Sequence, residues 1–210
     1  MRVASKLEEL FGADLRSLAI FRISLGLLLL TDLIQRAADL TAHYTDAGVL
    51  PRAALFGSPA SNPWHLSLHV ISGTWPVQAV LFLLAGLFAG LLLVGYRTRR
   101  TTFVSWVFLI SLHSRNPLLL YGGDALLRLL LFWSLFVPLG ARYSLDSLLN
   151  TSSDRLPKRV VSMGTVALLA QVVVLYEFTA VLKSGVEWHQ ESSAVYYALN
   201  LDQFATPLGT

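Results

Sequence analysis

Residues 75–95 read WPVQAVLFLLAGLFAGLLLVG and contain no charged side chain. A helix needs about 20 mainly apolar residues to cross the hydrocarbon layer of a bilayer. This stretch reaches that length without interruption. It therefore predicts a transmembrane helix, and the rest of the chain can be interpreted outward from it.

The composition of the whole chain agrees with a membrane protein. Of the 210 residues, 54% are hydrophobic and only 14% are charged, whereas a soluble domain averages about 25% charged residues. The apolar runs extend from Leu18 to Lys183 and leave no polar half that could fold separately. The sequence thus predicts a single membrane domain over residues 1–210, with the all-α fold of a polytopic helical bundle.

Four further apolar runs predict four more spans, at about residues 18–34, 101–112, 125–140 and 160–183. Together with residues 75–95 they make about five crossings. Pro117 and the Gly122–Gly123 pair predict a tight connection between the third and fourth spans. The first fourteen residues place apolar side chains at helical spacing and predict a short interfacial helix.

Basic residues predict the orientation of these spans. Ten lie on one predicted side: Arg2, Lys6, Arg16, Arg97, Arg99, Arg100, Arg142, Arg155, Lys158 and Arg159. The other side has Arg36, Arg52 and Arg115. Because basic loops stay in the cytoplasm, we expect a cytoplasmic-membrane protein with its N-terminus in the cytoplasm and the residues after Lys183 outside. We read the basic clusters as a topology signal and expect no nucleic-acid partner.

The predicted outer connection, residues 37–74, is much longer than a turn between two helices requires, and it is rich in Pro, Gly, Ser, Asn and His. Loops of this length are usually functional or contain short helices of their own. The last ten residues, LDQFATPLGT, offer no terminating cap or final anchor. We therefore expect the domain to be incomplete at its C-terminal end.

Charged residues within a span cost about 2.5–3.5 kcal/mol each at a helix centre, so each needs a partner or a role. Asp124 and Arg128 are four residues apart, as are Asp32 and Arg36. This spacing predicts two ion pairs with a structural role. Arg22 lies one turn into the first span, from where its long side chain is expected to reach the cytoplasmic interface.

The fifth span presents a different pattern. Tyr176, Thr179 and Lys183 recur at spacings of three and four, so a helix places them on one stripe. A lysine removed from water gives up its proton easily and can act as a base. The alternative is an interfacial lysine that reaches outward into water. Glu177 lies on the adjacent stripe.

Histidines in the outer connection are the remaining candidates. His65 and His69 have the i, i+4 spacing of a helical metal site, but the zinc-protease glutamate is missing. An interfacial helix with both histidines toward water is the favoured interpretation. His43 and Asp46 lie upstream in the same connection. The chain has no cysteine, which excludes Cys-based metal sites and thiolate nucleophiles, and we expect no metal.

Three segments together resemble one family. They are FRISLGLLLLTDLIQRAADLTAHYTDAGVLPR at 21–52, SRNPLLLYGGDALLRLLLFWSLFVPLGARYSLD at 114–146, and YEFTAVLKSGVEW at 176–188, followed by YYALNLDQFATPLG at 196–209. In this order they resemble the horizontally transferred transmembrane (HTTM) domain, the membrane part of vitamin K-dependent gamma-carboxylase. The resemblance covers nearly the whole chain.

This resemblance implies quinone-dependent oxygenation and carboxylation, the chemistry of a carbon–carbon lyase. Reduced vitamin K, a hydroquinone, is deprotonated and reacts with oxygen to give a strong base, which removes the gamma proton of a glutamate; carbon dioxide then adds, and the quinone leaves as an epoxide. The activating base of the family is a lysine with a tryptophan five positions later. Lys183 and Trp188 match that spacing.

The first hypothesis is therefore a membrane enzyme that binds reduced vitamin K or menaquinone through Tyr176, Thr179 and Trp188, with Lys183 as catalytic base and a secreted protein or peptide as substrate. Where the carboxylase has a histidine near its fourth span, this chain has Gly122, Gly123 and Asp124. The second hypothesis is a non-catalytic membrane partner that helps to mature or export another protein through the 37–74 connection. A transporter has less support, because the sequence shows no internal repeat.

Overall fold

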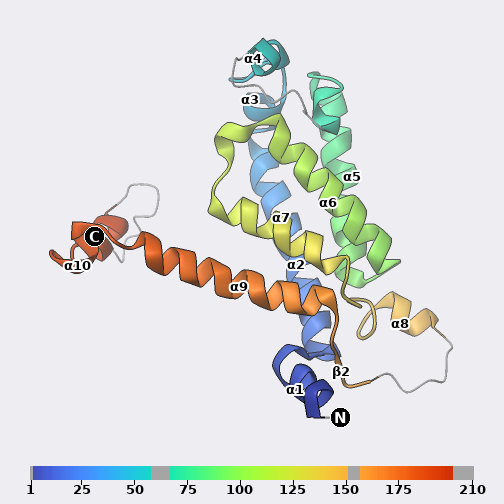
Figure 1. Ribbon diagram of the computed structural model, residues 1–210. Coiled ribbons are helices and arrows are strands. Elements are labelled where there is room, and N and C mark those ends of the chain that lie inside the picture. Colours follow the sequence, from blue (N-terminus) through green and yellow to red (C-terminus); the bar gives the residue numbers. More distant parts are fainter. Residues whose placement is uncertain (1, 58–66, 151–156, 201–210) are drawn as a thin grey trace. The chain divides into compact units, whose positions relative to one another are not determined.

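The computed structural model describes residues 2–57, 67–150 and 157–200, and these are almost entirely helical (Figure 1). The chain forms two compact units, residues 1–168 and residues 169–210. In the first unit the longer helices are α1 (Arg2–Phe11), α2 (Leu15–Ala38), α5 (Trp75–Val94), α6 (Thr98–Arg115) and α7 (Gly122–Ser134). The helix α9 (Met163–Leu182) begins in the first unit and continues into the second.

Among the described residues, three helices are long and apolar enough to cross a membrane: α2, α5 and α9. They coincide with the predicted spans at 18–34, 75–95 and 160–183. The run at 101–112 lies within α6, which is 18 residues long and includes Arg99 and Arg100 in its first turn. Those charges lower the hydropathy of α6 below that of the other three helices.

The predicted span at 125–140 was wrong in its extent. Its helix, α7, ends at Ser134 after 13 residues, which corresponds to about 20 Å at ~1.5 Å per residue. The chain then leaves the helix through tight turns before Pro138, with Phe136 N donating to Trp133 O and Val137 N to Ser134 O. Because proline lacks an N–H and disfavours helical geometry in the residue before it, an apolar run through Pro138 could not continue as one helix.

The core of the first unit lies where four helices meet. Helix α2 packs against α5, α5 against α6, and α6 against α7 (Figure 1). Buried side chains from all four form one cluster: Leu25, Leu29, Ala89, Leu92, Leu109 and Leu131. Gly26 allows α2 to approach α5 closely, because a Cβ there would lie 2.7 Å from Leu93 Cβ.

A two-residue antiparallel pairing joins the start of the bundle to the segment before α9. Strands β1 (Ala13–Asp14) and β2 (Arg159–Val160) pair Ala13 with Val160. Asp14 also caps α2, since its side chain accepts a hydrogen bond from Arg16 N at 2.7 Å. These contacts fix the position at which α2 begins.

The connection between α5 and α6 is organised around Gly95 and Asp146. Gly95 ends α5 in the left-handed conformation, with φ 73°. Asp146, in the short helix α8 (Leu145–Leu149), accepts hydrogen bonds from Arg97 N, Thr98 N and Thr98 Oγ1, each at 2.7 Å. A carboxylate from a distant part of the chain thus satisfies the free N–H groups at the start of α6.

Arg22 reaches this same connection, which was predicted to lie on the cytoplasmic side, but there its side chain is enclosed by protein. The residue is 1% exposed, and its Nη2 donates to Tyr143 O at 2.6 Å. Gly95 leaves space for the guanidinium, because a Cβ at that position would collide with Arg22 Nη1. The carbonyl oxygen of Tyr143 therefore replaces part of the hydration that the Arg22 guanidinium would have in water.

The predicted outer connection contains short helices, as expected. They are α3 (Leu40–Tyr44), α4 (Arg52–Gly57) and the 3₁₀ helix η1 (Leu68–Val70). Helix α3 packs on α5, and η1 packs on α5 and α6. Residues 58–66, which include His65, lie outside the described part of the chain, as do the last ten residues, 201–210.

Candidate functional site

A cluster of buried ionisable side chains lies at the end of the bundle near the 37–74 connection. Its centre is Arg36, in the last turn of α2. Arg36 donates to three partners: Nε to Asp32 Oδ1 at 2.8 Å, Nη1 to Tyr44 OH at 3.2 Å, and Nη2 to Asp124 Oδ1 at 2.8 Å. The side chain of Arg36 is 10% exposed and that of Asp124 only 3%. One guanidinium thus holds two carboxylates together in a largely water-free place.

Asp124 was predicted to pair with Arg128, and that pairing was wrong. Among the described residues, Arg36 is the ion-pair partner of Asp124, and the ring of His113 lies beside the same carboxylate oxygen. Its second oxygen, Oδ2, accepts a hydrogen bond from Tyr121 N at 3.1 Å and so caps the N-terminus of α7. The i, i+4 rule describes an isolated helix surface, whereas here a buried cation on another helix takes the carboxylate. The Asp32–Arg36 pair was predicted correctly.

His113, in the last turn of α6, is the residue of this cluster that the sequence did not indicate. Its ring is 1% exposed, and Nε2 lies 3.6 Å from Asp124 Oδ1. That separation is too long for a hydrogen bond. Among the described residues, neither ring nitrogen has a hydrogen-bond partner.

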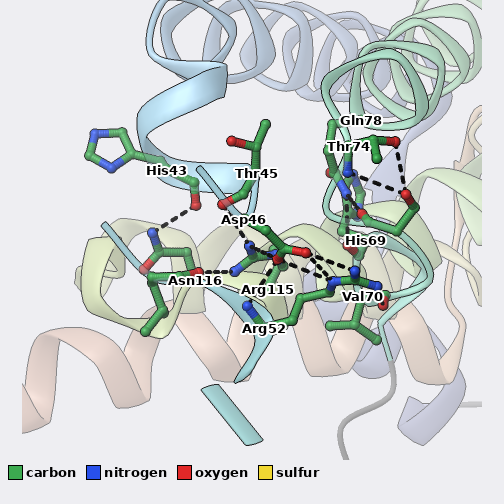
Figure 2. Close-up of polar contacts among 12 residues, drawn as sticks. His43, Thr45, Asp46, Arg52, His69, Val70, Thr74, Gln78, Arg115 and Asn116 are labelled. Carbon is green, nitrogen blue, oxygen red and sulfur yellow. Dashed lines mark hydrogen bonds and ion pairs between the residues drawn. The ribbon is translucent and has the colours of Figure 1, made fainter. Parts of the chain in front are cut away.

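A second polar cluster fixes the outer connection onto the bundle (Figure 2). Arg115, fully buried at the end of α6, donates to Leu50 O at 2.9 Å and to Thr45 O at 3.2 Å. Arg52 binds the carboxylate of Asp46, with Nη2 2.7 Å from Oδ2. The hydrogen bonds from Arg52 lower the pKa of Asp46 below its ordinary value. These contacts hold the first half of the connection in one conformation.

His69 lies beside this second cluster but is buried, so the prediction that it faces water was wrong. It is 1% exposed, in η1, and its ring meets that of Phe82 edge to face. Nδ1 lies 2.7 Å from Ser111 Oγ, and Gln78 Nε2 donates to His69 O at 2.8 Å (Figure 2). Burial lowers the pKa of His69 to about 4, so the ring is neutral near pH 7.

The predicted catalytic and quinone-binding residues all lie in the second unit. Tyr176 and Thr179 are on α9, and Lys183 follows its last residue directly. Lys183 Nζ lies 4.7 Å from the centroid of the Trp188 ring, which belongs to α10 (Val186–His189). Thr179 Oγ1 donates to Leu175 O at 2.6 Å, so its oxygen is left as an acceptor. The structure thus brings Lys183 and Trp188 together.

The comparisons with known proteins give no further guidance: no family model matches the chain, and no curated protein or solved structure matches it either. The positions of the candidate residues and the resemblance of the three segments described above are therefore the basis for a functional proposal.

Proposed function

We propose that this chain is a multi-pass protein of the cytoplasmic membrane, of the HTTM type. In this proposal the chain crosses the bilayer five times, in α2, α5, α6, α9 and the segment 122–140, of which α7 is the helical part, and the N-terminus lies in the cytoplasm. The excess of basic residues in the segments before α2, between α5 and α6, and between α7 and α9 supports that orientation. The end of α9, with Lys183, then lies at the extracytoplasmic surface.

We further propose that the protein is a gamma-carboxylase-like enzyme that acts with a reduced isoprenoid quinone, vitamin K or menaquinone. The contact between Lys183 Nζ and the Trp188 ring carries this proposal. The aromatic face holds Nζ in position, and the neutral amine form of Lys183 has the lone pair that accepts a proton. The same face can stack against a planar ring, so the pair offers an aromatic surface and a proton-binding nitrogen side by side.

Each residue has a separate task in this proposal. Lys183 accepts a proton at Nζ from a phenolic hydroxyl, Trp188 stacks against the ring, and Tyr176 and the free acceptor of Thr179 bind the polar edge. The reduced quinone, when bound, supplies the electrons with which oxygen is reduced. The apolar surface of α9 suits an isoprenoid tail.

The test uses the full chain purified in detergent, with reduced menaquinone and oxygen, and measures the quinone epoxide. Wild type and Lys158→Ala, a control at an exposed lysine, are expected to form epoxide at the same rate, and Lys183→Ala is expected to form none. Trp188→Phe keeps an aromatic ring and should retain more activity than Trp188→Ala. Equal epoxide formation in wild type and Lys183→Ala, or none in wild type, contradicts the catalytic proposal.

A second candidate is a non-catalytic membrane partner in the maturation or export of another protein. The observation that favours it is the anchoring of the 37–74 connection by buried Arg115, because a fixed outer loop presents a constant contact surface. An absence of epoxide, together with a secreted protein that co-purifies with wild type and is lost in Arg115→Met, would favour this candidate over the enzyme.

A further inference from the structure

A small cavity lies between α2, α5 and α6, within the first unit, where η1 covers the bundle. Its lining is mostly apolar and includes Leu29, Ala85 and Phe108. Three polar side chains also line it: Asp32, His69 and Ser105. Each of the three has a buried atom without a hydrogen-bond partner among the described residues, namely Asp32 Oδ2, His69 Nε2 and Ser105 Oγ.

The hydrogen bonds of Ser111 determine which nitrogen of His69 carries the proton. Ser111 Oγ accepts from Leu68 N at 2.7 Å and from His69 N at 3.2 Å. A hydroxyl oxygen has two acceptor positions and one hydrogen to donate. Because both acceptor positions are filled, Ser111 Oγ donates its hydrogen. The contact with His69 Nδ1 at 2.7 Å is much shorter than the contact with Ser67 Oγ at 3.3 Å, so His69 Nδ1 receives this hydrogen. Nδ1 is then the acceptor, and the neutral ring carries its hydrogen on Nε2.

The three free groups around the cavity are therefore complementary. His69 presents an N–H donor, Asp32 presents an acceptor oxygen, and the Ser105 hydroxyl can do either. His69 and Ser105 are 1% and 4% exposed, so bulk water does not satisfy them. Buried polar groups in proteins are almost always hydrogen-bonded, to protein or to ordered water.

The size of the cavity selects the occupant. Its volume is about 10 Å³, close to the roughly 10–15 Å³ that one enclosed water molecule needs, and a buried water typically has about three polar partners. An organic ring or an isoprenoid tail is far too large for this space.

We propose that the cavity binds one water molecule inside the bundle. The water accepts a hydrogen bond from His69 Nε2 and donates one to Asp32 Oδ2, and Ser105 Oγ is its third partner. Asp32 is also bound to Arg36, so the water connects the outer loop to the buried ion cluster. This proposal is independent of the role of Lys183.

The test is a structure of the full wild-type chain in a lipid nanodisc or a lipidic crystal, at a resolution at which other buried waters are visible. We expect a density peak within hydrogen-bond distance of His69 Nε2 and Asp32 Oδ2. A cavity without density, or a direct bond between His69 and Asp32, would overturn the proposal.

Two variants at one position provide a matched second test. The amide nitrogen of His69→Gln extends to the place of Nε2 and keeps a donor to the water, whereas His69→Asn is shorter and reaches only the place of Nδ1. We expect His69→Asn to lose the density peak and to unfold about 2–4 °C below His69→Gln. Identical melting temperatures with the peak retained in both variants would contradict a water held by Nε2.

Discussion

Arg36 Nη2 lies 2.8 Å from Asp124 Oδ1, and this contact joins the last turn of α2 to the first turn of α7. The two residues are 88 positions apart in the chain. Because Arg36 also binds Asp32 and Tyr44, the cluster connects three elements, namely α2, α3 in the 37–74 connection, and α7. It is the largest concentration of buried charge that the described residues contain.

Removal of Asp124 is expected to destabilise the bundle strongly. Asp124→Ala leaves Arg36 with one carboxylate in a buried place and frees the N–H of Tyr121. Breaking a buried ion pair from one side typically costs about 3–5 kcal/mol. Thermal unfolding in detergent measures the loss. The matched control is Asp39→Ala, which removes an exposed carboxylate just beyond α2. This change should alter the stability by no more than about 0.5 kcal/mol. Equal effects of the two substitutions would refute the role of the pair.

Replacement of His113 is expected to have the opposite effect and to stabilise the folded protein. The ring nitrogens of this buried histidine have no hydrogen-bond partner among the described residues, and an unsatisfied buried polar group costs about 1–3 kcal/mol. His113→Leu removes that cost and is expected to raise the melting temperature, while His113→Gln, which keeps a polar group, should not. A lower melting temperature for His113→Leu than for His113→Gln would show that the imidazole is bonded in the folded protein.

Gly95 is predicted to tolerate no side chain. Gly95→Ala places a Cβ in the left-handed region, at a cost of about 1–2 kcal/mol, and pushes it into the Arg22 guanidinium. Gly86→Ala is the control within the same helix, because no atom lies within 4 Å of a Cβ at that position. That change should stabilise α5 by roughly 0.5–1 kcal/mol. The two substitutions are thus expected to move the melting temperature in opposite directions, and a shift in the same direction would count against the fold of this connection.

Asp146 makes the stability of the first unit depend on pH in the acidic range. Burial alone would raise the pKa of this carboxyl, but hydrogen bonds from Thr98 and Arg97 outweigh it, so the pKa in the folded protein is below the ordinary value of 3.8. The contribution of Asp146 is therefore complete above about pH 4 and is lost as the pH falls through the folded pKa. Asp146→Asn replaces one carboxylate oxygen with an NH2 group that cannot accept a hydrogen bond from Arg97 or Thr98, and it should lower the melting temperature at pH 7, since a lost hydrogen bond costs about 1 kcal/mol. The difference from wild type should become smaller as the pH falls below about 4, and a difference that is constant with pH would contradict this account.

Much of the fold could be predicted from hydropathy, because three of the apolar runs are long and contain few charged residues, so that their helical structure needs no knowledge of neighbours. The end of α7 depended on Pro138, a local signal that the sequence contained. The partner of Asp124 could not be predicted in the same way. Arg128 is nearer in sequence, but the choice of Arg36 depends on how α2 and α7 come together in space.

The same distinction between local signals and long-range contacts applies to the candidate site. The family resemblance paired Lys183 with Trp188, and the structure places Lys183 Nζ 4.7 Å from the Trp188 ring. This proximity could be expected from the sequence, because only five positions separate the two residues. The sequence could not indicate that His69 and His113 are buried. His69 lies in a polar connection without a periodic pattern, and His113 lies at the end of α6. The residues that enclose them, such as Ser111 for His69 and Asp124 for His113, belong to other elements.

Membrane topology is the claim on which the rest of the account depends, and single cysteines test it most directly. The chain contains no native cysteine, and three exposed loop residues are suitable sites: Val49, Leu118 and Tyr143. A membrane-impermeant maleimide applied to intact spheroplasts should label Val49→Cys and Leu118→Cys, and should label Tyr143→Cys only after lysis. Labelling of Leu118→Cys only after lysis would show that α6 and α7 do not cross, and labelling of Tyr143→Cys with protection of Val49→Cys would contradict the proposed orientation.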